Sequence, residues 1–518
     1  MEQITKKHMV KRSEICFFIF FVSLLFAKGI GLYDGQTAFK VFLVIALMGW
    51  AGKAVLTSYS LREIVFYGTF LLLGGVVYVV SHEKGALFVA LLLCGMKNID
   101  LKRLFQVGLA TWALSFGSLF FLTALHVIDS PFKVHDRLGM GRVIRWNLGY
   151  AHPNVLHISY LVLVCFLVYL LQDRFRFYYL AVLEAGNLFV FMYSLSTTGF
   201  LVTTACLVLV CYWEIRKKFC KVEQVLIQCC LPLCLFLSFG APLLLKGRMF
   251  DHVNKLLNTR LELSKWFLQN QTAGLFGVDT TRIVTSLRTM DNSYVFAWIT
   301  YGILFFAFLM YLYVRGIYRR TMQQDGIALC LILSCLAAGL TEPFLFNTSF
   351  KNVSLLLVGP GLWMAGKETK EIGILAGFDR EAALQLPGLT AVWGDWKGAL
   401  KKYRSKLIIW ALAGALMGGI LVSVCVSYPD RYLLPRKAFE YTDDLTEGYY
   451  LTSGEDILQE GDRVLGYESA KTEMVAFAGN IAKVERFRNT VTGSIVAGAA
   501  VFVVASLFLL LGEKRRKG

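Results

Sequence analysis

The sequence predicts an all-α polytopic membrane protein with about 14 spans and with both termini in the cytoplasm. Apolar residues make up 56% of the 518-residue chain, and the mean hydropathy of +0.57 is too high for a soluble protein. Apolar runs close to the length of a bilayer-spanning helix recur along the chain. Their helical periodicity, with only nine prolines, argues against an outer-membrane barrel.

The formal net charge of +17 agrees with this class of protein. Most of the surplus lies in short loops on one side of the predicted spans, where the positive-inside rule places lysine and arginine. A basic soluble protein would suggest a nucleic-acid partner, but here the expected partner of the charge is the lipid bilayer, and no nucleic acid is expected.

The twelve cysteines and the first residues predict neither disulfides nor a cleaved signal peptide. All twelve cysteines lie in or beside apolar runs, so we expect no disulfide framework, and their spacing predicts no metal site and no cofactor. No small-residue cleavage site follows the basic start MEQITKKHMVKR and the first apolar run. We therefore expect an uncleaved first helix.

Residues 1–365 are expected to form the polytopic core. Alternating the sides of its spans from a cytoplasmic start places the dense Lys and Arg clusters, such as Arg216–Lys221, in the cytoplasm. Two cationic segments fall outside the membrane instead, Ile128–Ala151 and Lys246–Met290. The expected spans are about Ile15–Leu32, Phe39–Leu56, Ile64–Ser81, Ala86–Met96, Leu104–Val127, Pro153–Leu171, Phe177–Tyr193, Gly199–Trp213, Val225–Leu245, Ser293–Val314, Gly326–Leu340 and Asn352–Ala365.

The composition changes after residue 365. Residues 366–406 form a mixed-charge cytoplasmic linker, in which a short helix is expected at Asp379–Leu386 before Pro387-Gly388. Two further spans, Leu407–Ser427 and Val491–Leu511, form a transmembrane hairpin within residues 407–518. The hairpin encloses an acidic extracytoplasmic region, residues 428–490, whose second half (Glu468–Phe487) has helical apolar spacing.

The outer segment Lys246–Met290 contains seven lysines and arginines against three acids. Cations on the side of the membrane where the topology rule expects few of them need a reason. An anionic ligand held at the outer surface is the reason we favour.

A second candidate anion site lies at Arg137–His157. Arg142 and Arg145 precede His152-Pro153-Asn154, which opens a predicted span. Arginine forks bind phosphate oxygens in pairs, and a helix N-terminus attracts anions. The alternative is that the arginines contact lipid headgroups and that His152 caps the helix.

Acidic residues stand at two outer ends of predicted spans. Asp291 beside Arg260, Arg282 and Arg288 has the composition of a general base next to a phosphate clamp, although Asp is also an ordinary helix cap. Glu342 is either a second functional carboxylate or the partner of a loop arginine. The hydroxyl-rich joint Tyr193–Leu201 says little alone, because such hydroxyls usually bond to their own backbone.

In this order, the elements resemble the O-antigen polymerase and ligase superfamily, in particular the capsular and cell-wall polysaccharide polymerases of Gram-positive bacteria. The resemblance covers about Lys97–Ala365. It departs at Thr197, where the family has arginine, and at Asp291, where the ligases have histidine and the related peptidoglycan polymerases an acid. The matching positions are Arg142 and Arg145 with Leu148–Leu156, Ser196–Gly199, Arg260 with Trp266 and Phe276-Gly277, and Asp291–Val295 with Gly302-Ile303.

The resemblance implies a lipid-sugar glycosyltransferase (GT-C-like) core of about 12 helices in a bacterial plasma membrane, with an extracytoplasmic active site and no metal or cofactor. The donor would be an oligosaccharide on undecaprenyl diphosphate, and the acceptor a second lipid-linked unit. Asp291 would be the base, with His152 and Glu342 as further catalytic candidates. The diphosphate clamp would comprise Arg142, Arg145, Arg260, Arg282 and Arg288, and the substrate-positioning residues would be Asn154, Asn292, Tyr294 and Trp266.

Two other functions stay open from the sequence. A ligase of the same fold would move a finished glycan to another acceptor, and a flippase would carry the lipid-linked oligosaccharide across the membrane. A transporter should line a central cavity with charge, whereas the charges here gather at outer helix ends. The acidic region 428–490 is a candidate contact for a chain-length regulator or another polysaccharide-assembly protein.

Overall fold

The chain is a mostly helical, multi-pass membrane protein. The computed structural model describes residues 9–124, 127–128, 130–137, 141–257, 259–281, 283–284, 289–363, 371–383, 402–429, 431–439, 452–453, 460–466, 473–478 and 481–517. Ten helical stretches in these residues are long and apolar enough to cross a membrane, and each overlaps a predicted span. They are α3 (Thr37–Leu56), α4 (Leu61–Ser81), α6 (Leu101–Ala124), α7 (Pro153–Leu171), α8 (Phe177–Ser194), α9 (Thr197–Arg216), α10 (Lys221–Leu235) continued to α11 (Ala241–Leu244), α15 (Gly302–Met322), α19 (Arg404–Cys425) and α21 (Ile481–Lys517).

The other predicted spans are helices of a different kind. The first, α2 (Arg12–Gly29), is 18 residues long and carries Arg12, Glu14 and Lys28. Three more are short: α5 (Gly85–Gly95), α16 (Gly326–Ala338) and α17 (Val353–Val358). The 11 residues of α5 reach roughly 16 Å, about half of the hydrocarbon thickness.

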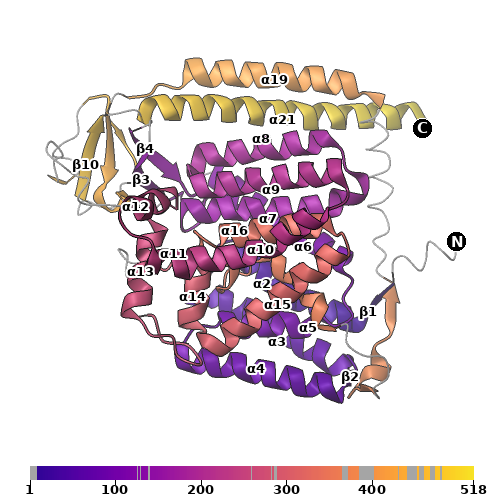
Figure 1. Ribbon diagram of the computed structural model, residues 1–518. Helices are drawn as coiled ribbons and strands as arrows, with labels where there is room; N and C mark the ends of the chain where they lie inside the picture. The colour runs from indigo at the N-terminus through magenta and orange to yellow at the C-terminus, as the bar shows by residue number, and fades with distance from the viewer. Residues whose placement is uncertain are drawn as a thin grey trace.

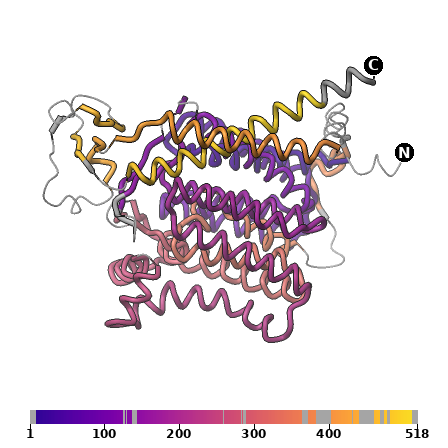
Figure 2. The backbone as a smooth tube through the Cα atoms, turned by 90° about the horizontal axis from the view of Figure 1, so that it is seen from above, coloured from indigo at the N-terminus to yellow at the C-terminus, as the bar shows by residue number. Residues whose placement is uncertain are grey.

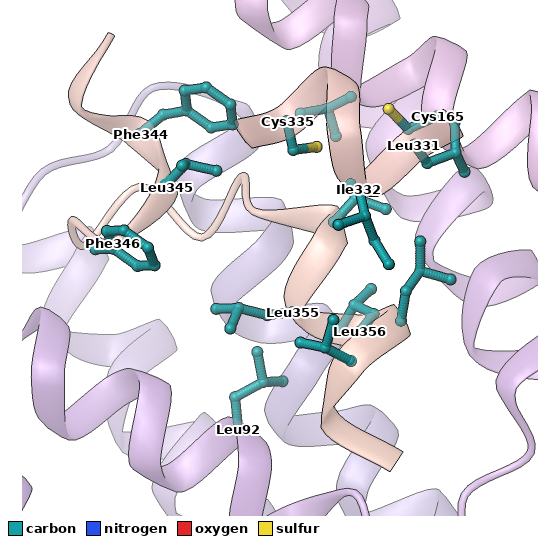
Figure 3. Packing of buried hydrophobic residues seen from close by; sticks show 14 of the residues in the cluster. Leu92, Cys165, Leu331, Ile332, Cys335, Phe344, Leu345, Phe346, Leu355 and Leu356 are labelled. Atoms are coloured by element: carbon teal, nitrogen blue, oxygen red, sulfur yellow. The ribbon is translucent and has the colours of Figure 1, made fainter. Parts of the chain in front are cut away.

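The short helices form the centre of the bundle. Leu93 of α5 and Leu331 of α16 are fully buried, and Leu357 of α17 is 1% exposed. Figure 3 shows side chains from these three helices meeting in one apolar cluster. By contrast, Leu412 and Leu416 of α19 are 65% and 68% exposed, as expected for a helix that faces lipid. Half-length helices are therefore covered by longer ones.

Strands mark the two ends of the bundle (Figure 1). At one end, the predicted outer segment after α6 forms a hairpin of β3 (Phe132–Arg137) and β4 (Gly141–Trp146). A four-stranded sheet with the order β8-β10-β7-β9 lies beside this hairpin, and both views place it at this end (Figure 2). Its strands are β7 (Arg431–Pro435), β8 (Thr452–Ser453), β9 (Arg463–Val464) and β10 (Glu473–Ala478). We call this the hairpin end.

Two smaller ladders lie at the opposite end and correct one prediction. β1 (Met9–Lys11) pairs with β6 (Glu381–Ala383), and β2 (Tyr59–Ser60) pairs with β5 (Glu371–Ile372). The helix expected at Asp379–Leu386 is therefore wrong for the residues described there. The N-terminal strand offers this segment a ladder, which outweighs its weak helical propensity.

The helix expected at Glu468–Phe487 is also wrong in its first part. Residues Glu473–Ala478 form β10, which pairs antiparallel with β7, and the helix α21 begins only at Ile481. Met474 and Val475 are both fully buried, although adjacent residues of a strand point to opposite faces. A strand covered on both sides leaves no alternating pattern in the sequence.

The long cationic segment contains two helices, α12 (Gly247–Leu256) and α13 (Arg260–Asn270). Its later part is fastened to the membrane helices by backbone bonds. Val278 N donates to Ile299 O at 3.0 Å, and Ile303 N donates to Gly274 O at 3.1 Å. This contact falls where the predicted span Ser293–Val314 is interrupted, between α14 (Ser293–Thr300) and α15.

Two glycines make the interruption possible. Gly277 and Gly302 both have positive φ, +92° and +78°. A Cβ on Gly302 would lie 2.2 Å from the backbone nitrogen of Gly277. The two glycine motifs of the sequence therefore meet in one close backbone contact that excludes any side chain.

We expect Gly302→Ala to lower the free energy of unfolding by about 1–3 kcal/mol, because alanine is strained at this φ and collides with backbone. The thermal midpoint of the detergent-solubilised protein measures this loss. Gly68→Ala is the matched control, since a Cβ at Gly68 in α4 meets nothing within 4 Å. That substitution should leave the midpoint unchanged or raise it slightly. Equal midpoints for both variants would contradict the close contact.

Candidate functional site

A network of charged and polar side chains lies at the hairpin end. Arg145 of β4 is 2% exposed, and its Nη2 donates to Asn154 Oδ1 at 2.7 Å. Asn154 Nδ2 in turn donates to Glu342 Oε1 at 2.8 Å. Arg145 and Asn154 belong to the same sequence motif, whereas Glu342 lies 188 residues after Asn154. We call these residues, with Arg260 and Asp291, the site network.

Arg260 and Asp291 form the second half of the site network. Arg260 Nη2 lies 3.1 Å from Asp291 Oδ2, with side chains 13% and 22% exposed. Arg260 Nε donates to the backbone oxygen of Thr341 at 3.4 Å, which brings the guanidinium beside Glu342. A pocket next to this pair is lined by Arg260, Ser264, Phe267, Thr289, Met290, Asp291 and Asn292.

Local structure explains how Arg145 and Asn154 are placed. Arg145 Nε donates to Ser194 O at 2.9 Å, at the carboxyl end of α8, where the backbone turns through Leu195 at φ +44°. Asn154 follows Pro153 in the first turn of α7. His152 Nδ1 accepts from the Asn154 backbone N–H at 3.2 Å, so His152 caps α7. This is the alternative role that the sequence left open for His152.

Glu342 lies between the end of α16 and a 3-10 turn (Pro343–Leu345). Ser293 Oγ holds this corner by donating to Glu342 O at 2.6 Å and accepting from Leu345 N at 3.2 Å. Burial raises the pKa of Glu342 to about 7; Asp291 acts in the same direction, and Arg260 and Arg145 oppose it. The carboxyl group is therefore near its titration point at neutral pH.

Lys351 is a charged residue at this place that the motif analysis missed. It is 5% exposed, and its ammonium group lies 5.5 Å from the centre of the Tyr150 ring. Burial lowers the pKa of Lys351 to about 7, and the negative charge of Glu342 partly offsets this. The available signal was a single cation in the turn TEPFLFNTSFK between two apolar helices, which by itself is typical of a loop.

The other predicted site residues fall into three groups. Arg282 and Arg288 lie outside the described residues, as does the side chain of Arg142, whose backbone pairs with Asp136 in the β3–β4 hairpin. Asn292 Oδ1 caps α14 and Tyr294 is fully buried with its hydroxyl donating to Leu336 O, so both stabilise the helix itself. Trp266 is half-buried on α13 beside Phe267.

The arrangement suits a ligand with concentrated negative charge. Arg145, Arg260 and Lys351 bring positive charge to one place, and two carboxylates, Asp291 and Glu342, lie among them. Among the described residues there is no cluster of three or more His, Cys, Asp or Glu side chains arranged for a metal ion. The positive charge of the described site therefore comes from its own arginine and lysine side chains.

Comparison with known proteins supplied no relative: no family model, no curated protein and no solved structure matches this chain.

The two shifted pKa values predict a minimum of stability near pH 7. Glu342 has a pKa of about 7 in the fold and 4.5 ordinarily, so the fold binds its proton more tightly and the free energy of unfolding falls from about pH 4.5 to 7. Lys351 has a pKa of about 7 in the fold and 10.5 ordinarily, so the free energy of unfolding rises from about pH 7 to 10.5. The change should be on the order of 3 kcal/mol for Glu342 and on the order of 5 kcal/mol for Lys351.

Thermal midpoints across pH, compared between the wild type and single variants, test this expectation. Glu342→Gln should remove the fall on the acid side, and Lys351→Met should remove the rise on the alkaline side. If both variants keep the pH dependence of the wild type, the two groups do not titrate as their burial implies.

Proposed function

We propose that this protein is a membrane glycosyltransferase that polymerises undecaprenyl-diphosphate-linked oligosaccharide repeats into a surface polysaccharide. The observation that carries the proposal is the convergence of Arg145, Asn154, Arg260, Asp291 and Glu342 at one end of the bundle. Arg145 and Asn154 come from one motif of the sequence resemblance, Arg260 and Asp291 from two others, and Glu342 from a turn outside these motifs. No one of these segments required the convergence. We place this end at the outer face of the bacterial plasma membrane, where lipid-linked repeats are joined.

The positive charges fit the leaving group of such a reaction. When the acceptor hydroxyl attacks the anomeric carbon of the donor, the bond between that carbon and the diphosphate oxygen breaks. The diphosphate leaves with the electron pair and gains negative charge. Arg145 and Arg260 are fixed in place before the reaction, and preorganised cations of this kind stabilise the developing charge. Arg142, Arg282 and Arg288 remain candidates for the same clamp.

The acceptor proton needs a base, and two carboxylates are available. The sequence pattern assigned this role to Asp291, but in the fold the Asp291 carboxylate is held in an ion pair with Arg260. Glu342 is more deeply buried, and burial raises its pKa to about 7. A base is most effective with a pKa near the working pH. We therefore propose that Glu342 accepts the proton and that Asp291 orients Arg260.

Reconstitution with a defined lipid-linked repeat tests the proposal as a whole. A polymerase should convert the single units into a ladder of longer lipid-linked chains without any added nucleotide sugar. Transfer of the glycan only to a different acceptor would favour the ligase alternative. Movement of intact single units across the membrane, with no ladder, would favour the flippase.

Glu342→Gln and Asp291→Asn should both abolish the ladder and leave single lipid-linked units to accumulate, but for different reasons. Glu342→Gln should retain donor binding, since it removes only the proton acceptor, whereas Asp291→Asn should weaken binding because Arg260 loses its partner. Donor binding and ladder formation are measured on the same preparations. A normal ladder in Glu342→Gln would return the role of the base to Asp291.

Reversing the charge of Arg260 should weaken binding of a lipid diphosphate by on the order of 2–5 kcal/mol, as for a buried charge pair broken on one side. Farnesyl diphosphate is a soluble probe for this measurement. Arg248→Glu is the control, because Arg248 lies exposed on α12. This substitution changes the net charge of the protein by the same amount as Arg260→Glu. Equal binding by Arg260→Glu and Arg248→Glu would place the clamp elsewhere.

A further inference from the structure

The first turns of α21 are buried against the β3–β4 hairpin, where they form a contact between the C-terminal extension and the core. Glu485 and Arg488 of α21 form an ion pair, with whole-residue exposures of 7% and 4%. Two charged side chains buried this deeply at the start of a helix need specific surroundings. The extension has no counterpart in the family resemblance, so the proposed chemistry does not account for this pair.

Residues of the core surround the ion pair. Trp146 Nε1 donates to Glu485 Oε1 at 3.1 Å. The Arg488 guanidinium lies 5.1 Å from the centre of the Trp146 ring and 4.9 Å from that of Tyr193. One turn further along α21, the hydroxyl groups of Thr492 and Tyr193 lie 2.6 Å apart. A planar guanidinium held between two aromatic rings fixes both rings relative to the helix.

An apolar cluster reinforces the same contact. Val134 and Ile144 of the β3–β4 hairpin pack with Tyr432, Leu434 and Val475 of the C-terminal sheet and with Ile481 at the start of α21. A further isolated β-bridge joins Val134 to Phe439. The hairpin is thus part of the same apolar core as the C-terminal sheet, while α19 and α21 run along the outside of the bundle beyond α8 (Figure 1).

The two aromatic residues are direct neighbours of the site network. Trp146 follows Arg145 in β4, and Tyr193 precedes Ser194, whose carbonyl oxygen accepts from Arg145. Arg145 and Ser194 are joined by a hydrogen bond, and the ion pair of α21 therefore contacts a chain neighbour of each of these two residues. A shift of α21 relative to the core would move Trp146 and Tyr193, and with them the guanidinium of Arg145.

We propose that Glu485 and Arg488 are positioning residues, through which the C-terminal extension sets Arg145 for binding of the diphosphate. The inference rests on the proposed function for the identity of the ligand, but the coupling between α21 and the β3–β4 hairpin does not depend on it. The extension then acts on donor binding rather than on the proton transfer. It contacts Trp146 and Tyr193, the chain neighbours of Arg145 and Ser194, and makes no described hydrogen bond to Glu342.

Two measurements on the full-length protein in detergent test this proposal. The first is amide hydrogen exchange of residues 141–146, and the second is binding of farnesyl diphosphate. Arg488→Met should raise exchange in β4 and weaken probe binding about tenfold, while Arg488→Lys, which keeps the charge but loses the flat group between the rings, should have an intermediate effect. Lys483→Met is the control, since Lys483 is exposed on the same helix, and it should change neither measurement.

A single substitution at Arg488 leaves Glu485 as an unpaired buried charge, which could by itself unfold this region. A second variant avoids this by removing both charges. Glu485→Gln/Arg488→Met removes both charges together, and it should bind the probe as weakly as Arg488→Met while the exchange of α7 and α9 stays as in the wild type. Wild-type binding and wild-type β4 exchange in this double variant would overturn the proposal. If Arg145→Lys leaves probe binding unchanged while Arg488→Met still raises β4 exchange, the diphosphate clamp fails and the coupling stands.

Discussion

The hydrogen-bonded chain from Arg145 through Asn154 to Glu342 is the constraint on which the hairpin end of this protein depends. A buried guanidinium and a buried carboxyl group are costly to remove from water unless each finds polar partners. The fold supplies those partners from four separate segments: β4, the end of α8, the first turn of α7 and the corner after α16. Each of these segments must reach its place before the charges are satisfied, so the network and the packing of the bundle stabilise one another.

The interior of the bundle explains why polar groups can lie so close to membrane helices. Three helices are too short to cross a bilayer, and α14 is separated from α15 at Gly302. A helix that ends within the membrane leaves backbone N–H and C=O groups unpaired. Such helix ends are tolerated only where protein surrounds them. Here α5, α16 and α17 are enclosed by longer helices, and the corner that carries Glu342 begins where α16 ends. Short helices thus create the position that the catalytic proposal uses.

The C-terminal extension adds a second layer to this end of the molecule. Its transmembrane helices lie outside the bundle, but its sheet and the start of α21 share an apolar cluster with the hairpin that carries Arg145. A module joined to the core at the proposed donor site can influence that site without contributing a group to the reaction.

The sequence by itself determined the class of protein, ten long spans and the segments from which the site is built, because these depend on local composition and on motif order. Only the tertiary structure decided which residues meet. Glu473–Ala478 became a strand because β7 was there to pair with it, and the span after Asp291 was interrupted because Gly277 packs against Gly302. Lys351 could not be distinguished from an ordinary loop cation, because its burial comes from helices far away in the chain. Partners distant in sequence carry no local signal, and burial, pairing and shifted pKa values all depend on them.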